Sequence, residues 1–173
     1  VSSFFTFYDG KDFRTNWNEI DFEFLGKNTN QVDTNVIKTY RKLTDKNESV
    51  RKTTLEKRSE DVYWKLCIEW QPGLITWKIN DRIIRIMNPS TLKTPQKLMM
   101  NIWQGNPEWA GEFNSGLLPQ EAVYKYVRYS KYSSITGKFE FEWQDDFYGV
   151  NNDRWYIATH NTGLTQLVKE NVS

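Results

Sequence analysis

Three acidic residues alternate with hydrophobic ones at positions 19–24 and offer the clearest chemistry in this sequence. Side chains of a β-strand point alternately to opposite faces, so Glu19, Asp21 and Glu23 would project from one face. Retaining glycoside hydrolysis uses two carboxyl groups about 5–5.5 Å apart, one as nucleophile and one as acid and then base. Along an extended strand the Cα atoms of Glu19 and Glu23 lie about 13 Å apart. The strand would therefore have to curve to bring their carboxyl groups within about 5–5.5 Å of each other. Asp21 would lie between them and adjust their ionisation.

Two other interpretations of the acidic strand stay open at this point. Like charges in a row repel one another, and a structural strand tolerates them where its face is well solvated. A calcium site also uses carboxylates, although an extended strand lacks the loop curvature and backbone oxygens that calcium prefers. The acidic strand is therefore a solvated face, a calcium site or a hydrolytic pair.

The composition of the chain excludes several other classes of function. With 173 residues, 23 basic and 22 acidic side chains, the net charge is +1, which provides no strong attraction for nucleic acid or an anionic membrane. One cysteine, Cys67, rules out an internal disulfide framework, and one histidine, His160, rules out a multi-histidine metal centre. Aromatic residues make up 16% of the chain, and their faces suit stacking on sugar rings as well as core packing.

The elements that must position the acids are predicted to be antiparallel β-strands. Runs of β-branched and aromatic residues recur between turns rich in Asn, Asp, Gly and Pro, and no segment of helical length has a 3.6-residue apolar period. Asn80-Asp81, between two such runs, predicts a tight hairpin. The charge-rich stretch 41–61 is interpreted as a solvated loop or edge strands. We expect an all-β sandwich with strands within 1–7, 19–25, 63–70, 75–79, 83–87, 97–103, 122–131 and 138–143.

The stretch 17–26, Trp-Asn-Glu-Ile-Asp-Phe-Glu-Phe-Leu-Gly, resembles the active-site signature of glycoside hydrolase family 16. Within that family it is most similar to the bacterial lichenases, which are endo-1,3-1,4-β-glucanases. Further stretches resemble the family in the same order and spacing, and the resemblance covers most of residues 1–131. These stretches are 1–6, 69–73, 75–80, 98–105 and 109–111.

The resemblance implies a jelly roll with a concave glucan-binding cleft and a retaining endo-β-glucanase activity on mixed-linkage 1,3-1,4-β-D-glucan. Carried onto matching positions, Glu19 would be the nucleophile, Asp21 the assisting carboxylate and Glu23 the acid/base. The residues expected to line the cleft and bind glucan are Phe5, Trp17, Asn35, Asn101, Trp103, Trp109 and Tyr148.

No cofactor is expected for this chemistry. Many family members bind a structural calcium, and Lys125 stands at the matching position in this sequence. A lysine ammonium has no acceptor atom to offer a cation, which disfavours calcium here. Because the glucan is too large to enter a cell, the resemblance also implies a secreted, extracellular protein.

The order of segments departs from most of the family. Residues 139–155 resemble the segment that opens most members, as in a circularly permuted rumen-type lichenase, and such permutation is tolerated when the original ends lie close together. We therefore expect one jelly-roll domain over 1–173, with cleft strands in 1–131 and a permuted segment in 138–173. The family's strands that would follow residues 168–173 are expected on a second polypeptide, or to be cut away or unrecorded.

Two other functions share part of this pattern. A xyloglucan or β-glucan transglycosylase of the same family would use the same signature. A non-catalytic glucan-binding β-sandwich would explain the aromatic content without turnover.

Overall fold

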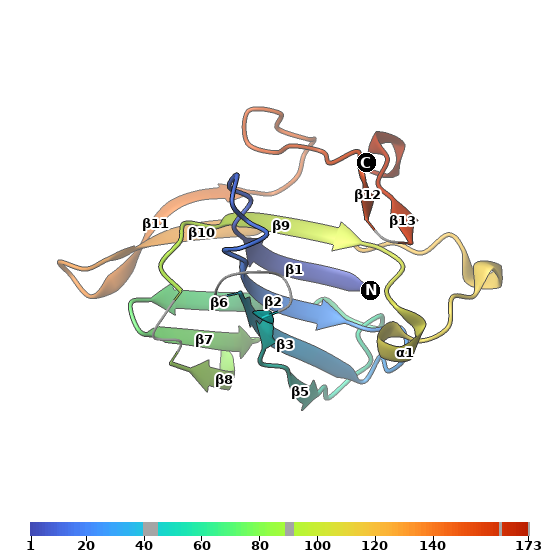
Figure 1. Cartoon of the computed structure of the whole chain (residues 1–173), viewed down its shortest axis with the longest axis horizontal. Coiled ribbons are helices and arrows are strands. Elements are labelled where there is room, and N and C mark those ends of the chain that lie inside the picture. The colour runs from blue at the N-terminus through green and yellow to red at the C-terminus, as the bar shows by residue number, and fades with distance from the viewer. Residues whose placement is uncertain (40–44, 89–91, 163, 173) are drawn as a thin grey trace. The chain divides into compact units, whose positions relative to one another are not determined.

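The computed structural model describes residues 1–39, 45–88, 92–162 and 164–172, which group into two compact units, Val1–Asn114 and Ser115–Ser173. Strands dominate both units, and the helical segments are short (Figure 1). The expected antiparallel all-β class is confirmed. One domain over 1–173 stays a prediction, and each unit is described by itself.

A six-stranded antiparallel sheet forms one layer of the first unit. Its central strand β2 (Asn18–Phe24) lies between β1 (Ser2–Phe7) and β3 (Gln31–Lys38). The remaining strands lie further out: β9 (Lys97–Ile102) on β1, and β4 (Asn47–Glu48) with β5 (Arg51–Thr54) on β3. The last two fall in the charge-rich stretch 41–61, which confirms the edge-strand interpretation there, whereas residues 41–44 lie outside the described residues.

A three-stranded meander forms the second layer. It consists of β6 (Leu66–Gln71), β7 (Leu74–Ile79) and β8 (Arg82–Met87). Between the last two strands Asn80 has φ 48° and Asp81 φ 65°, the left-handed conformation that a two-residue hairpin turn requires and that Asn and Asp tolerate. The predicted hairpin is confirmed.

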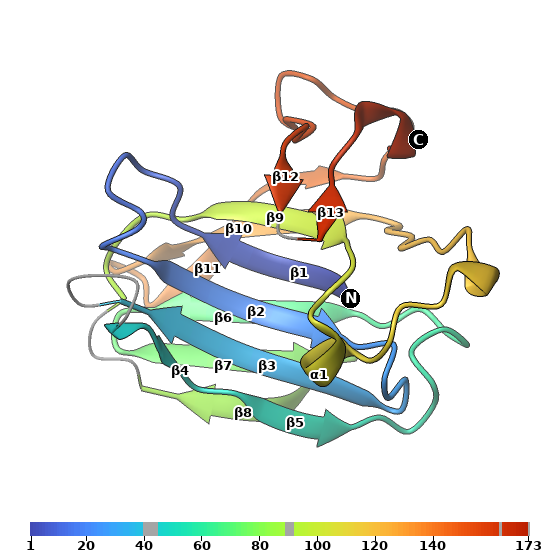
Figure 2. The same cartoon turned by 45° about the vertical axis from the view of Figure 1, so that its right-hand side comes forward.

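The core lies between these two sheets, with the second sheet behind β2 and β3 in Figure 2. Ile20 and Phe22 alternate with the acids along β2 and are fully buried, as are Ile75 and Trp77 of β7. The core cluster comprises Ile20, Phe22, Val32, Val36, Leu55, Ile75, Trp77, Ile79 and Leu92. Because the apolar face of β2 is committed to this core, its acidic face is turned away from the second sheet.

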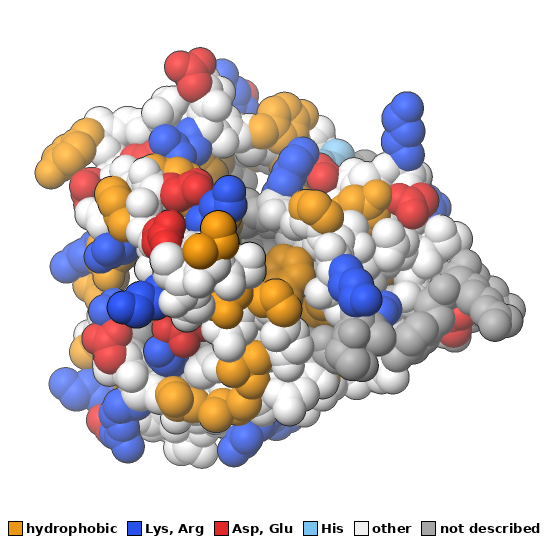
Figure 3. Space-filling model, turned by 90° about the vertical axis from the view of Figure 1, so that its left-hand side faces the viewer, with side chains coloured by type: hydrophobic (Ala, Val, Ile, Leu, Met, Phe, Trp, Pro, Cys, Tyr) orange, Lys and Arg blue, Asp and Glu red, His pale blue; other side chains and the backbone are white. Residues whose placement is uncertain are grey.

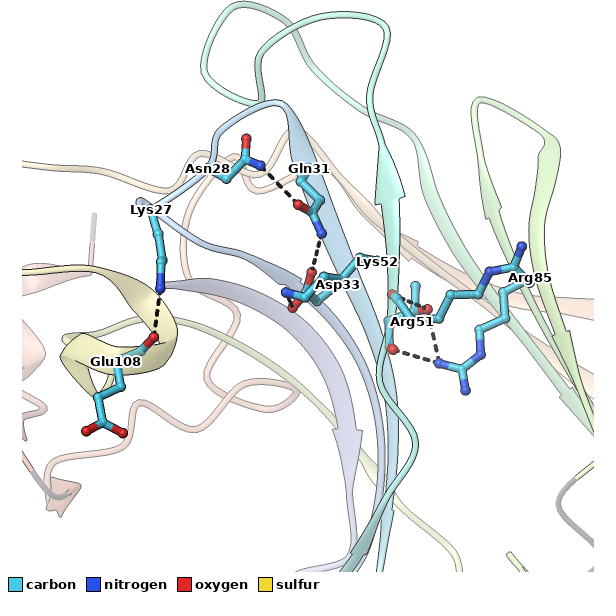
Figure 4. Close-up of polar contacts among 9 residues, drawn as sticks. Lys27, Asn28, Gln31, Asp33, Arg51, Lys52, Arg85 and Glu108 are labelled. Atoms are coloured by element: carbon cyan, nitrogen blue, oxygen red, sulfur yellow. Dashed lines mark hydrogen bonds and ion pairs between the residues drawn. The ribbon is translucent and has the colours of Figure 1, made fainter.

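Two side chains of the second sheet make polar contacts with the first sheet inside this core. The indole Nε1 of Trp77 donates a hydrogen bond of 3.0 Å to the backbone oxygen of Asp21. Arg85, which is 6% exposed and labelled in Figure 4, donates to the backbone oxygen of Thr34 at 2.6 Å. It also donates to Ser49 Oγ at 2.8 Å. Its guanidinium also lies 4.7 Å from the Trp77 ring centroid, and burial lowers the pKa of Arg85. These contacts position the strands that carry and flank the acids.

A short helix closes the first unit. Helix α1 (Pro107–Ala110) has proline at its start and Asn106 as its N-cap, whose side chain accepts from the Glu108 backbone N–H at 2.9 Å. At the other end Gly111 has φ 98° and lies against Lys27, where a side chain would be strained. Four residues are too few to show helical periodicity, so the sequence pattern does not reveal this helix.

The second unit is built on a hairpin of β10 (Val127–Ser133) and β11 (Lys138–Asp145). The strand expected over 122–131 thus starts only at Val127. Trp155 packs on Trp143 at 6.1 Å between ring centroids, and its Nε1 donates to Asp145 at 2.7 Å. The remaining elements are η2 (Ser115–Leu117), β12 (Asn161–Thr162), β13 (Thr165–Gln166) and η3 (Lys169–Asn171).

Basic and acidic side chains are interspersed on the face shown in Figure 3, in keeping with the balanced net charge of +1. Within the described ranges no helix has the length and apolar character needed to span a membrane.

Replacing Trp77 with Phe should destabilise the protein by about 2–4 kcal/mol, because it leaves the Asp21 carbonyl without its donor and leaves a cavity. Chemical denaturation measures this change. Trp64→Phe is the matched control, since the buried Trp64 Nε1 has no partner among the described residues and its loss removes no hydrogen bond. The control should cost at least about 1 kcal/mol less, and equal losses would contradict a stabilising role for the Trp77 bond.

Candidate active site

The acidic face of β2 is crowded and largely dehydrated. Asp21 is 1% exposed, while Glu19 and Glu23 are half-buried. Such burial contradicts the well-solvated face considered above, because these carboxyl groups have lost most of their water. Three neighbouring carboxyl groups in this setting cannot all carry a charge without a large energetic cost.

Asp21 is the carboxyl that holds its proton most strongly. Burial raises its pKa well above the usual range, and the charges of Glu19 and Glu23 on either side raise it further. Its side chain is hydrogen-bonded to Glu19, and no donor reaches its Oδ2 among the described residues. Asp21 therefore acts as a carboxylic acid that donates to Glu19, rather than as a third anion.

Most of the groups around Glu19 favour its ionised form. Burial raises its pKa, as does the negative charge of Glu48, whereas hydrogen bonds from Trp17 Nε1 and from Asp21 lower it, together with the positive charge of Lys46. Trp17 is itself held in place, since its ring packs on Phe7 at 5.1 Å and the Lys46 ammonium lies 5.0 Å from its centroid. A desolvated carboxylate with two donors is suited to be a nucleophile.

Glu23 has the opposite environment. Its pKa is raised to about 7, first by burial and then by the negative charges of Glu19, Asp33 and Glu48, against which Lys46 acts weakly. The groups acting on Glu23 are thus mostly other carboxylates, which favour its neutral form. A carboxyl with a pKa near 7 is suited to give and take a proton at neutral pH.

The register of the sheet brings three of the expected glucan-binding residues beside these acids. Phe5 of β1 and Asn35 of β3 are the direct neighbours of Asp21 on either side. Asn101 of β9 lies in the same row as Glu23, one strand further away. Residues directly opposite across strands have their Cβ atoms about 4.5–5.5 Å apart and share a face.

The side chains of Asn35 and Asn101 differ in their hydrogen-bond partners. Asn35 Oδ1 accepts from the Ser49 backbone N–H at 3.0 Å, which orients its amide group. Asn101 Oδ1 is buried and has no partner among the described residues, so it can accept from a ligand. Both can hydrogen-bond sugar hydroxyl groups.

Trp103 and Trp109 lie together at one end of this face, with ring centroids 5.9 Å apart. Trp109 on α1 forms part of the wall of a cavity of about 540 Å³. Lys27 fixes the helix there, because its backbone N–H and its Nζ donate to Ala110 and Glu108 carbonyl oxygens, each at 2.8 Å. The cavity is lined by Leu25, Lys27, Asn28, Gln31, Asp33, Lys52, Glu108 and Trp109.

Tyr148 is fully exposed and belongs to the second unit, so its place at the cleft stays a prediction. Lys125 precedes β10 rather than lying within it. Among the residues that the structure describes, no group of three or more His, Cys, Asp or Glu side chains could hold a metal ion. The expectations that calcium is disfavoured and that no cofactor is required stay predictions.

Sequence reasoning missed Lys46, Glu48 and Asp33, the charged residues that act on the acids from neighbouring segments. Asp33 follows Glu23 by ten positions and meets it only through the antiparallel register of β2 and β3. The stretch over β3 has polar residues on both faces and therefore lacks a clear alternating pattern.

Comparison with known proteins places this site in a family. Residues 1–128 match the model of glycosyl hydrolases family 16. A beta-glucanase of Bacillus subtilis (strain 168) is 37% identical over 137 residues, 76% of this chain and 52% of that protein. A xylanase/beta-glucanase of Ruminococcus flavefaciens is 38% identical over 133 residues, 76% of this chain and 16% of that protein.

Solved structures agree with this assignment. Bacillus licheniformis beta-glucanase superposes with a TM-score of 0.55 at 34% identity, covering 66% of this chain and 51% of that one. A prokaryotic beta-1,3-1,4-glucanase (lichenase) derived from a mouse hindgut metagenome gives 0.55 at 31% identity, covering 65% and 51%. The chain spans about half the length of the Bacillus relatives that it matches. From these matches and the acidic strand at its centre, the chain belongs to glycosyl hydrolases family 16.

Proposed function

We propose that this chain carries the catalytic carboxyl groups of a retaining endo-β-glucanase that hydrolyses mixed-linkage 1,3-1,4-β-D-glucan. The observation that supports this most is the contrast between two glutamates on one strand face. Glu19 accepts hydrogen bonds from Trp17 and Asp21, whereas Glu23 faces carboxylates and has a pKa of about 7. Environments that separate the ionisation of two carboxyl groups assign their acid and base roles.

In the first step the Glu19 carboxylate attacks the anomeric carbon of the scissile glucosyl unit. Glu23 donates its proton to the glycosidic oxygen, the bond between that oxygen and the anomeric carbon breaks, and the shortened glucan leaves. The product is a glycosyl ester on Glu19. Asp21 donates to the Glu19 carboxylate before the attack and steadies its position.

In the second step water attacks the same anomeric carbon and the ester bond to Glu19 breaks. Glu23 accepts the proton that this water loses. A change of charge helps Glu23 to act as an acid in the first step and as a base in the second. Esterification removes the negative charge of Glu19, and that charge raises the Glu23 pKa. The Glu23 pKa therefore falls once the ester has formed, so that Glu23 is deprotonated and available as a base at the moment when a base is needed.

The substrate follows from the family and from the relatives, among them proteins named beta-glucanase and beta-1,3-1,4-glucanase. Phe5, Asn35 and Asn101 lie beside the acids, and Trp103 and Trp109 beyond them offer aromatic faces for glucose rings. Transfer of the glycosyl group to a sugar acceptor would follow the same first step. Product analysis with barley β-glucan and an acceptor oligosaccharide distinguishes hydrolysis from transfer.

Secretion, the permuted order of 138–173 and a completing second polypeptide remain proposals. A polymeric glucan is available only outside the cell, which motivates the first. Intact mass and denaturing electrophoresis of active material test the last, and activity from a single 20.6 kDa chain would count against it.

Glu19→Gln should lower the rate of reducing-sugar release from barley β-glucan by roughly 10⁴-fold or more, because the amide is not a nucleophile. Glucan binding, measured by affinity electrophoresis, should persist. Glu56→Gln, which removes a glutamate paired with Arg82 on the surface, is the control and should keep full activity. An undiminished rate in Glu19→Gln would disprove the assignment.

The pH profile of kcat/KM should be bell-shaped with its alkaline limb near pH 7, where Glu23 loses the proton that it must donate. The acid limb should lie above the usual glutamate value, because burial raises the pKa of Glu19, which must be ionised. In Glu23→Gln the alkaline limb should disappear and the rate should fall by about 10²–10⁴-fold. Steady-state kinetics between pH 4 and 9 measure both effects, and an alkaline limb that survives in this variant would show that another group is the acid.

A further inference from the structure

A fourth acidic residue lies on the same face of the sheet, directly beside Glu23. The register of β2 and β3 pairs Asp33 with Glu23, so their side chains project together. Asp33 is 2% exposed, which makes it as strongly dehydrated as Asp21. Neither the proposed double displacement nor the sequence motif uses this carboxylate.

Asp33 forms an ion pair with a lysine from a different strand. Lys52 of β5 places Nζ 2.9 Å from Asp33 Oδ2, and Gln31 Nε2 lies 3.4 Å from Oδ1 (Figure 4). The lysine side chain is 60% exposed, whereas that of Asp33 is 2% exposed. The positive end of this pair is therefore screened by water and the negative end is not, so the Asp33 charge still acts on its neighbours.

The strands on the other side of Glu23 carry no charge in its row. Its neighbours in the same row towards the other edge are Ser3 and Asn101, which carry no charge. The charged and titratable groups that act on it, or that it acts on, are Glu19 and Asp21 of β2, Asp33 of β3, Lys46 and Glu48 at β4, and the amino group of Val1. Among these charged groups on neighbouring strands, Asp33 is the one in direct register with Glu23.

We propose that Asp33 is a positioning residue for Glu23, whose buried negative charge, anchored by Lys52, keeps the Glu23 carboxyl in the protonated form that donates to the leaving group. The inference rests on the proposed function, in which Glu23 is the acid. Lys52 partly neutralises the Asp33 charge. A tighter or looser Asp33–Lys52 ion pair therefore changes how strongly Asp33 favours the protonated form of Glu23. Asp33 and Lys52 also line the cavity beside Trp109. A glucan bound in this cavity would therefore alter the strength of the Asp33–Lys52 ion pair.

Two single variants test this through the alkaline limb of kcat/KM. Asp33→Asn removes the negative charge with little change of shape and should move the limb to lower pH by about half a unit to one unit. Lys52→Gln leaves the Asp33 charge less compensated and should move the limb to higher pH by a smaller amount. Lys52 is well exposed, so this variant should fold even if Asp33→Asn is destabilised. A purely structural role of the pair would not move the limb in opposite directions.

Controls separate this effect from a general loss of charge. Glu69→Gln breaks the Glu69–Lys78 pair on the outer face of the second sheet and should leave the limb in place. Asp33→Glu retains the charge and should restore the wild-type limb. A limb that stays unmoved in both Asp33→Asn and Lys52→Gln, or that moves in the same direction in both, would overturn the proposal.

A second measurement tests the role of Asp33 separately from the proposed glucanase activity. Titration of the Glu23 carboxyl by carbon NMR in glutamate-labelled protein requires no turnover. A midpoint that falls in Asp33→Asn supports the proposal even if the wild-type chain hydrolyses no glucan, which would defeat the proposed function alone. A midpoint that does not move in an active protein would defeat the role of Asp33 alone.

Discussion

The structure depends on one electrostatic constraint, that three carboxyl groups on one dehydrated strand face cannot all be ionised. Packing of Ile20 and Phe22 against the second sheet commits the apolar face of β2 to the core, and Glu19, Asp21 and Glu23 are left together on the other. Desolvation is the largest influence on the pKa of each of the three. The neighbours then decide which group keeps a proton and which does not.

The six-stranded sheet distributes those neighbours unevenly along β2. At the Glu19 end the segment before β2 supplies the Trp17 indole, and the segment before β4 supplies Lys46. At the Glu23 end β3 supplies Asp33, a further carboxylate, with its own cation farther out in solvent. Two hydrogen-bond donors act on Glu19 and Asp33 acts on Glu23, whereas the charges of Lys46 and Glu48 reach both, and this difference gives two chemically identical side chains different affinities for a proton. The donors to Glu19 lie two positions away in sequence, whereas the charges that act on both glutamates from other strands are a property of the sheet.

The second sheet makes the arrangement rigid without contributing a group to the acidic face. Trp77 donates to the backbone of Asp21 itself, and Arg85 donates to Thr34, which lies between Asp33 and Asn35 on β3. Buried hydrogen bonds from the second sheet thus hold β2 and β3, the two strands at the centre of the site. A site of this kind needs its side chains held by well-packed elements, since small displacements change both distances and ionisation.

The sequence by itself determined the strand class, the hairpin at Asn80-Asp81, the common face of the three acids and, through resemblance, the family. These features depend on local alternation, turn chemistry and a contiguous motif, which are readable along the chain. It did not reveal β3, whose polar residues lie on both faces, nor the loop that precedes Val127, where an apolar run continues outside the strand.

Only the tertiary structure decided which side chains distant in sequence surround each acid. Asp33 and Glu23 are ten positions apart and Lys46 and Glu19 are 27 positions apart, yet each pair interacts electrostatically. Their meeting depends on strand register and on chain reversals, which are set by packing of the whole first unit rather than by residue type. The burial that raises the pKa of Glu23 to about 7 is likewise a property of the assembled sheet, because an isolated strand would leave that carboxyl in water.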